Sequence, residues 1–127
     1  MLYLCPHKAH TDFRNFIIKA MNIQELLNRT DRFAANAGCK ITEVDTEHAV
    51  AEMVVTTAHL NGANVCQGGA LFTLADLAIA ALMNAHGQLT VGISNSIMFV
   101  SSAKEGDLLR AEESKIGRAV QQECRDR

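Results

Sequence analysis

The sequence predicts an α+β domain in which an antiparallel sheet wraps one long buried helix. Residues 68–85 are apolar on every side of a helix, which is typical of a helix that is buried all round. Residues 39–56 have the pattern of a β-hairpin, and residues 90–100 and 107–116 have the pattern of two further strands. A length of 127 residues fits a single domain.

Composition narrows the class of protein. The chain is 48% hydrophobic and 20% charged with a net charge of -2, and its basic residues are scattered, so we expect no nucleic-acid partner. The apolar run 68–83 is shorter than the roughly 20 residues that span a bilayer, and Asp76 interrupts it. We therefore expect no membrane span. With no secretory signal and no C-x-x-C pair, we expect a cytoplasmic protein with reduced thiols.

The chain divides into three parts. Residues 1–20 have no clear period and are interpreted as an N-terminal extension. The domain is expected over residues 21–118, and residues 119–127 form a polar tail.

The domain should begin with one helix over residues 22–36. Asn22 can cap it, with Glu25 three residues on as the partner of a capping box, and Gly38 can end it. Its apolar positions share one face: Ile23, Leu26, Leu27, Phe33, Ala34 and Ala37.

Strands follow on both sides of the long helix. Residues 39–44 and 49–56 form the hairpin, with a turn-like stretch between them. After the helix, residues 90–100 form a strand that alternates Val91, Ile93, Ile97 and Phe99 with a second set of residues.

Asp76 is the first candidate for chemistry. A carboxylate within a buried apolar helix is costly unless it is solvated, paired or protonated, and burial would raise its pKa and make it a better base or nucleophile. The alternatives are a carboxylate bonded to neighbouring backbone, or one at an exposed rim.

The loop before the helix adds three candidates. The first-turn N–H groups at Gly68 and Gly69 lack intrahelical partners and can hold an oxyanion, although a simple glycine turn would look the same. Gln67 can donate to a carbonyl or cap the helix. Asn61 can orient water or substrate, or form a turn with Gly62.

Spacing constrains how these groups act together. Gly68 and Asp76 are eight residues apart, or about 12 Å along a helix. One carbonyl carbon can hardly touch both. If both are catalytic, the site needs two chains, and a twofold dimer would supply two such sites.

The sequence gives less support to a cysteine nucleophile or to a metal site. Cys66 could be a nucleophile with His59 or His86 as base, but free cysteines are commonly inert core residues. The histidines show no metal-ligand spacing, so we expect no metal and no cofactor.

These residues resemble the signature of hotdog-fold acyl-CoA thioesterases of the phenylacetate-pathway type. The match reaches from about Asn22 to Arg118. Its motifs are Asn61-Gly62, Cys66-Gln67-Gly68-Gly69, the LFTLAD run that ends at Asp76, Asn84 and Gly87.

The resemblance implies a hotdog fold, subunits paired as homodimers or dimers of dimers, and an acyl-CoA substrate bound at the interface. It implies that Asp76 is the general base or nucleophile and that the Gly68 N–H polarises the thioester. It also implies that Asn61, from across the interface, places the water. Gly69, Gly92 and Ser94 would line the substrate site.

The sequence departs from the family at two places. The family most often has His where Gln67 stands, and an amide can donate a hydrogen bond but cannot titrate. Relatives continue past Gly117-Arg118 with two more strands, which the polar tail does not replace, so the sequence reads as truncated, frameshifted or partial.

We expect a version without those strands to be unstable or prone to aggregate, because a strand edge stays unpaired and the helix uncovered. A soluble, monodisperse product that melts cooperatively would contradict this.

The leading hypothesis is hydrolysis of a small or medium, including aryl, acyl-CoA to the free acid and CoA. The second is a non-catalytic hotdog protein that binds acyl-CoA or serves assembly. A hotdog dehydratase is a weaker third reading, because those enzymes typically use a His that Gln67 replaces.

Overall fold

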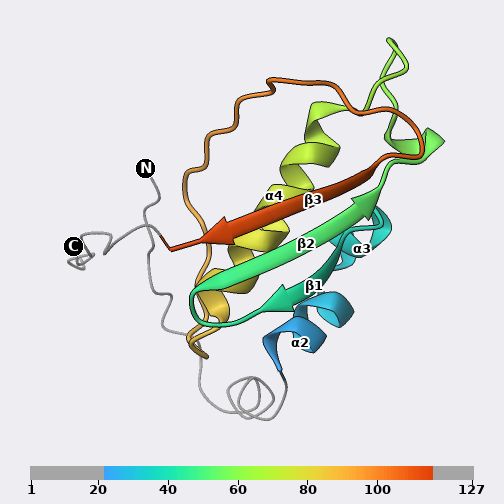
Figure 1. The fold of residues 1–127 in the computed structure, drawn as a ribbon. Coiled ribbons are helices and arrows are strands. Elements are labelled where there is room, and N and C mark those ends of the chain that lie inside the picture. Colours follow the sequence, from blue (N-terminus) through green and yellow to red (C-terminus); the bar gives the residue numbers. More distant parts are fainter. Residues whose placement is uncertain (1–21, 116–127) are drawn as a thin grey trace.

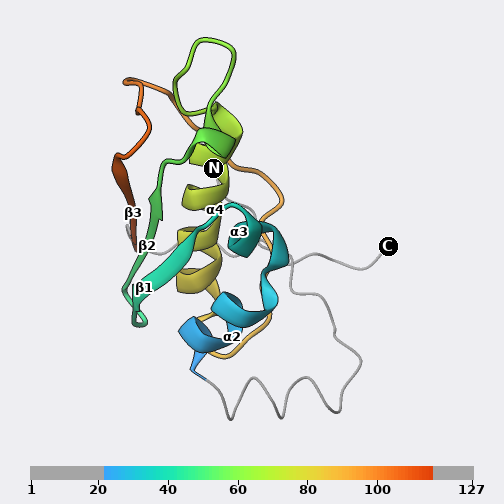
Figure 2. The same ribbon diagram turned by 90° about the vertical axis from the view of Figure 1, so that its right-hand side faces the viewer.

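A three-stranded antiparallel sheet packs one face against a single long helix, α4 (Figure 1). The computed structural model describes residues 22–115, so the N-terminal extension, the Gly117-Arg118 turn and the polar tail lie outside it. The elements are α2 (Ile23–Thr30), α3 (Arg32–Asn36), β1 (Lys40–Val44), β2 (His48–Val54), η1 (Thr57–His59), α4 (Gly68–Asn84) and β3 (Leu108–Ser114). Figure 2 shows the sheet edge-on, with α4 beside it and with α2 and α3 next to α4.

The sheet confirms the predicted hairpin and the last predicted strand. Strand β2 is central and pairs antiparallel with β1 and with β3, in the order β1-β2-β3. A register shift between Ile41 and Glu43 marks a bulge in β1. Side chains of alternate residues point to α4, and Ile41, Ala51 and Met53 are buried there at 1% exposure or less.

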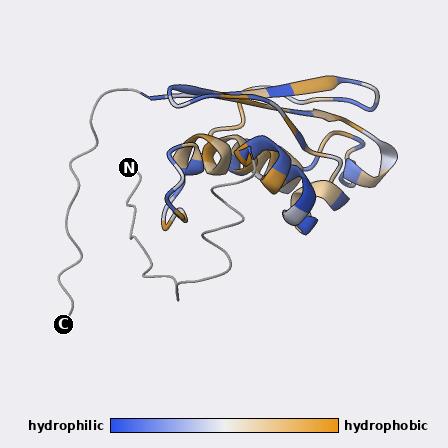
Figure 3. Cartoon of the chain, turned by 90° about the horizontal axis from the view of Figure 1, so that it is seen from below, coloured by the Kyte–Doolittle hydropathy of each residue, from blue (hydrophilic) through white to orange (hydrophobic). Residues whose placement is uncertain are grey.

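Helix α4 begins and ends where the sequence predicts, but it is not buried all round. Its fully buried apolar residues lie toward the sheet: Leu74, Leu77, Ala78, Ala81 and Leu82. Among residues 22–115 the side of Asp76 is open, because the three described strands cover only one side of the helix. Figure 3 shows the sheet lying across the helices as a separate layer. No helix among residues 22–115 is long and apolar enough to cross a membrane.

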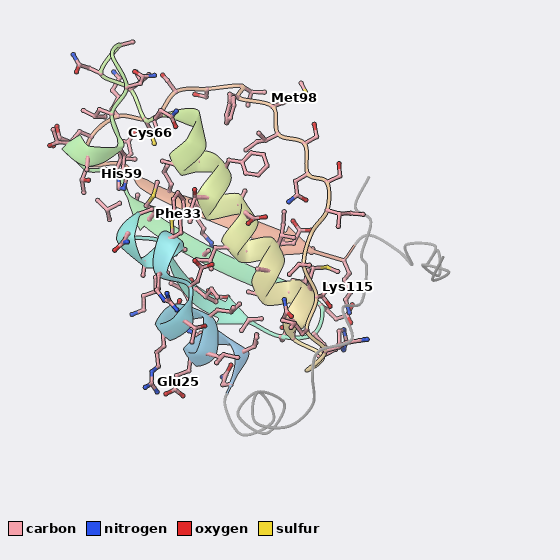
Figure 4. The ribbon with its side chains drawn as sticks, turned by 180° about the vertical axis from the view of Figure 1, so that it is seen from behind. Glu25, Phe33, His59, Cys66, Met98 and Lys115 are labelled. Atoms are coloured by element: carbon pink, nitrogen blue, oxygen red, sulfur yellow. The ribbon has the colours of Figure 1, made fainter. Side chains whose placement is uncertain are left out.

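The single helix predicted over residues 22–36 is wrong, because the chain breaks at Asp31. Asp31 has a non-helical ψ of 88°, and its side chain accepts the Ala34 N–H at 3.0 Å, so it caps a new helix, α3. The break turns Phe33 outward, and its side chain is 74% exposed although the helical pattern placed it on the buried face (Figure 4).

The caps of this region are partly as predicted. Asn22 caps α2, but its oxygen accepts the Gln24 N–H, and Glu25 lies 3.7 Å from Arg29 instead of closing a capping box. Gly38 ends the helical region with a φ of +72°, a conformation that glycine adopts without strain.

The strand predicted over residues 90–100 is also wrong. This stretch belongs to what we call the return segment, residues 90–103, which runs back along α4 without forming a strand (Figures 1 and 4). A strand needs a neighbour to receive its ladder hydrogen bonds. The described sheet ends at β3, which lies beside β2 and not beside the return segment.

Asn84 should be the residue that fixes the start of the return segment. It is 8% exposed, its Nδ2 donates to Ala80 O at 2.9 Å and Thr90 O at 3.0 Å, and its Oδ1 accepts the Thr90 N–H at 2.8 Å. Asn84→Leu would leave buried backbone groups unpaired, and we expect it to lower the free energy of unfolding by about 1–3 kcal/mol. Urea denaturation measures this as a lower midpoint with an unchanged slope. Gln88→Ala, at a neighbouring exposed position, is the control and should change little; equal midpoints for both variants would refute the role of Asn84.

Candidate active site

The start of α4 presents one free backbone donor. Gln67 is the N-cap, and its side-chain oxygen accepts the Gly69 N–H. The Gly68 N–H has no hydrogen-bond partner within residues 22–115, so it remains free to bind an acceptor. A Cβ at Gly69 would lie 2.6 Å from the Gln67 oxygen, so a side chain there would displace the cap.

The Phe99 side chain packs against the same helix start. A Cβ at Gly68 would lie 2.9 Å from Cζ of Phe99, a residue of the return segment. Glycine therefore lets the ring approach the backbone closely. The Phe99 ring is 56% exposed, so this end of the helix is only partly covered.

Asn61 shapes the loop that precedes the helix. Its side-chain oxygen accepts the Ala63 N–H at 2.9 Å and the Val65 N–H at 3.3 Å, so it performs the turn role that was one of its two expected uses. Its NH₂ group has no partner in the described part of the chain. Asn61 is exposed, and it can still donate a hydrogen bond but has little capacity left to accept one.

Asp76 lies on the open side of α4. Its side chain is exposed, so a single chain matches the alternative of a carboxylate at an exposed rim and not that of a desolvated one. Oδ1 accepts a hydrogen bond from Nδ2 of Asn95 at 3.0 Å, and Oδ2 has no hydrogen-bond partner among residues 22–115. The carboxylate is therefore held on one side and accessible on the other.

A cleft of about 210 Å³ adjoins this carboxylate. Its lining residues are Asp76, Ile79, Ala80, Met83, Thr90, Val91 and Gly92. The structure thus places Gly92 beside Asp76, whereas Ser94 is exposed and does not line the cleft. The walls are mostly apolar, which suits an acyl group next to one carboxylate.

The two halves of the predicted site lie apart in one chain. Gly68 and Asp76 belong to one regular helix, and eight residues of rise separate them by about 12 Å. Asn61 and Gln67 are near the start of that helix, and Gly92 is near Asp76. The predicted site residues of a single chain therefore form two separate groups.

The sequence reading missed Asn95 and Phe99 as site residues. Asn95 is the polar member of an otherwise apolar alternating set, Val91, Ile93, Ile97 and Phe99. An amide at such a position needs a hydrogen-bond partner, and that signal was available. The contact of Phe99 with Gly68 had no local signal, because it depends on how the return segment crosses α4.

The structure gives Cys66, His59 and His86 burial or contacts that do not favour nucleophilic catalysis. Burial raises the pKa of the Cys66 thiol, which disfavours a thiolate nucleophile. His59 has both ring nitrogens engaged: Nδ1 accepts the Thr56 N–H at 2.9 Å, and Nε2 lies 2.8 Å from Ala37 O (Figure 4). His86 contacts the Lys115 ammonium. Within the described ranges, no group of three or more His, Cys, Asp or Glu residues could hold a metal ion.

Comparison with known proteins shows which family the chain resembles. The family model described as the thioesterase superfamily matches residues 63–122. The Archaeoglobus fulgidus protein named "Putative esterase" is 39% identical over 94 residues, which are 74% of this chain and 61% of that protein. The acyl-coenzyme A thioesterase PaaI of Escherichia coli strain K12 is 37% identical over 93 residues, which are 73% and 66%.

A solved structure extends the match to the fold. The E. coli PaaI protein from the phenylacetic acid degradation operon superposes with a TM-score of 0.62 and 34% identity, covering 78% of this chain and 70% of that one. The chain belongs to the thioesterase superfamily and has the α+β hotdog fold of the PaaI type. It spans somewhat less than two thirds of the length of the two curated relatives.

Cys39 should be an unreactive thiol in the native state. Burial, helped by the charge of Asp31, raises its pKa from 9.0 to about 11, so only about 0.1% is thiolate at pH 8. We expect iodoacetamide to label Cys39 in 6 M urea but not in native protein, as read by peptide mass spectrometry. Because the folded pKa is the higher one, the associated stability is complete below about pH 9 and is lost as the pH rises through about 11. Rapid native labelling would contradict this burial.

Proposed function

We propose that this chain hydrolyses a small or medium, including aryl, acyl-CoA thioester to the free acid and CoA. One observation carries the proposal: a single rigid helix bears a free N–H at Gly68 and, on its open side, the half-free carboxylate of Asp76 beside an apolar cleft. Membership of the thioesterase superfamily supports it, as does the name of the E. coli relative, an acyl-coenzyme A thioesterase.

The Gly68 end supplies the electrophilic half of the reaction. The free N–H at the positive end of the helix dipole can bind the thioester oxygen and stabilise the oxyanion that forms there. The Gln67 NH₂ group can add a second donor, because only the oxygen of its amide is used by the cap. Neither donor titrates near neutral pH, so this half does not change with pH.

The Asp76 end supplies the basic half. Its free Oδ2 can take a proton from a water that attacks the carbonyl, or it can attack the carbonyl itself. Asn61 can donate its NH₂ to that water, and its oxygen, already bonded to two N–H groups, would not compete for the proton. When water attacks, the C–S bond breaks and the CoA sulfur takes up the proton; when Asp76 attacks, CoA leaves from a mixed anhydride that water then hydrolyses. Both routes give the free acid and the CoA thiol.

Two copies of the chain complete the site. The 12 Å between Gly68 and Asp76 prevents one thioester from contacting both in one chain. A twofold pair would set Gly68 and Asn61 of one copy against Asp76 of the other and create two equal sites. The return segment offers exposed apolar surface along α4 for such a pairing: Val91, Ile93, Met98, Phe99 and Val100. We propose a homodimer or a dimer of dimers.

A second function is favoured by Gln67. Its oxygen is committed to the cap, and the residue has no titratable group where relatives most often have His. A non-catalytic protein that binds acyl-CoA would need no such group. Saturable binding of acyl-CoA and CoA in calorimetry, with no release of thiol, would identify this function.

Asp76→Asn should abolish most turnover. The amide keeps the shape of the carboxylate but cannot accept a proton or act as nucleophile, so we expect kcat to fall by about 10²–10⁴-fold. Release of free CoA from a panel of short, medium and aryl acyl-CoA substrates measures it, with Asp76→Ala as a second variant. Glu105→Gln, on an exposed loop, is the control because it removes the same single negative charge away from the proposed site. Undiminished turnover by Asp76→Asn would eliminate the proposed mechanism.

Mixing two inactive variants tests the two-chain site. Asp76→Ala and Asn61→Ala each damage every site of their own dimers. After unfolding and refolding together, half of the dimers are mixed, and each mixed dimer has one intact site, so we expect about a quarter of the wild-type activity. Activity no higher than that of the separate variants would show that each site lies within one chain.

A further inference from the structure

We infer that Asn95 is a positioning residue that holds the Asp76 carboxylate in one orientation for the thioester reaction. This inference rests on the proposed function and names a residue that the sequence motif does not contain. It is carried by one direct contact, the 3.0 Å hydrogen bond from Nδ2 of Asn95 to Oδ1 of Asp76.

The register of the return segment makes this contact specific. The segment runs antiparallel to α4 and is tied to it at both ends (Figure 4). Thr90 is bonded through its N–H and its carbonyl to Asn84 at the end of the helix. Phe99 lies against Gly68 at the start of the helix.

A third tie lies just beyond the helix start, where Cys66 N donates to Ala103 O at 2.8 Å. Asn95 stands midway between Thr90 and Phe99, and Asp76 stands midway along α4. The contacts at both ends of the return segment therefore place the Asn95 amide next to the carboxylate. A shift of the segment by one residue along α4 would separate the two groups.

The chemistry of the bond suits a positioning role. An amide donates to a carboxylate without exchanging its proton, so it fixes Oδ1 and leaves Oδ2 without a hydrogen-bond partner among residues 22–115. Asp76 is the charged residue among the seven that line the cleft, and none of the ion pairs among residues 22–115 includes it. The side chain of Asn95 is itself half-buried, whereas both of its serine neighbours are exposed.

Two variants separate orientation from charge. Asn95→Leu keeps the size of the side chain and removes the donor, and we expect kcat to fall about tenfold with little change in KM. Asn95→Asp places a like charge against Asp76, and we expect the acidic limb of the kcat/KM profile to move up by about one pH unit. Ser96→Ala, one residue away and exposed, should leave both quantities unchanged. A merely structural role would lower the stability of Asn95→Leu and leave the kcat of its folded protein unchanged.

A measurement that needs no activity completes the test. Carboxyl ¹³C NMR follows the titration of Asp76 in the wild type and in the three variants, and we expect its midpoint to rise in Asn95→Asp and to stay unchanged in Ser96→Ala. An unchanged midpoint in Asn95→Asp would show that the two side chains do not meet, and it would overturn the inference.

The two proposals fail in different ways. If wild-type protein releases no thiol from any substrate, the thioesterase function fails, and with it the role of Asn95 in that reaction. If the wild type is active and Asn95→Leu retains its kcat while Asn95→Asp retains its pH profile, the function stands and the inference about Asn95 is wrong.

Discussion

The one-sided burial of α4 is the constraint on which the rest of the structure depends. Its sequence is apolar on every side, yet within residues 22–115 three strands cover only the side that carries Leu77 and Ala81. The hydrophobic effect fixes that side firmly and leaves the other to the return segment and to solvent. Asp76 lies on the open side, so the packing that builds the core also determines where chemistry can occur.

The side-chain amides of Asn61, Gln67 and Asn95 each use one group, the oxygen or the NH₂, in a hydrogen bond that the structure shows. The oxygens of Asn61 and Gln67 accept backbone N–H groups of the loop and of the helix start, and their NH₂ groups have no partner among residues 22–115. The amide of Asn95 is turned the other way, with its NH₂ on Asp76. The free NH₂ groups, with the Gly68 N–H, give one half-site hydrogen-bond donors and leave the carboxylate as the acceptor of the other. This polarity suits an acyl transfer, in which negative charge develops on the carbonyl oxygen while a base removes a proton.

The rigidity of α4 is the reason why we propose a site shared by two chains. Within α4 the distance between Gly68 and Asp76 cannot change without breaking backbone hydrogen bonds, so no conformational adjustment brings both to one carbonyl. Pairing by a twofold axis removes the difficulty, because it sets the start of one helix against the middle of the other. The same pairing would cover exposed apolar side chains such as Ile93 and Phe99.

The sequence by itself determined α4, the hairpin, the last strand and the Gly68–Asp76 spacing, because each follows from a local period or a fixed rise per residue. Tertiary structure decided the remainder. Asp31 caps a new helix and interrupts the continuous helical pattern, which leaves Phe33 exposed. Residues 90–100 have strand-like alternation, but a strand exists only where a neighbouring strand accepts its hydrogen bonds. Asp76 meets Asn95 only because contacts at both ends of the return segment fix its register along α4.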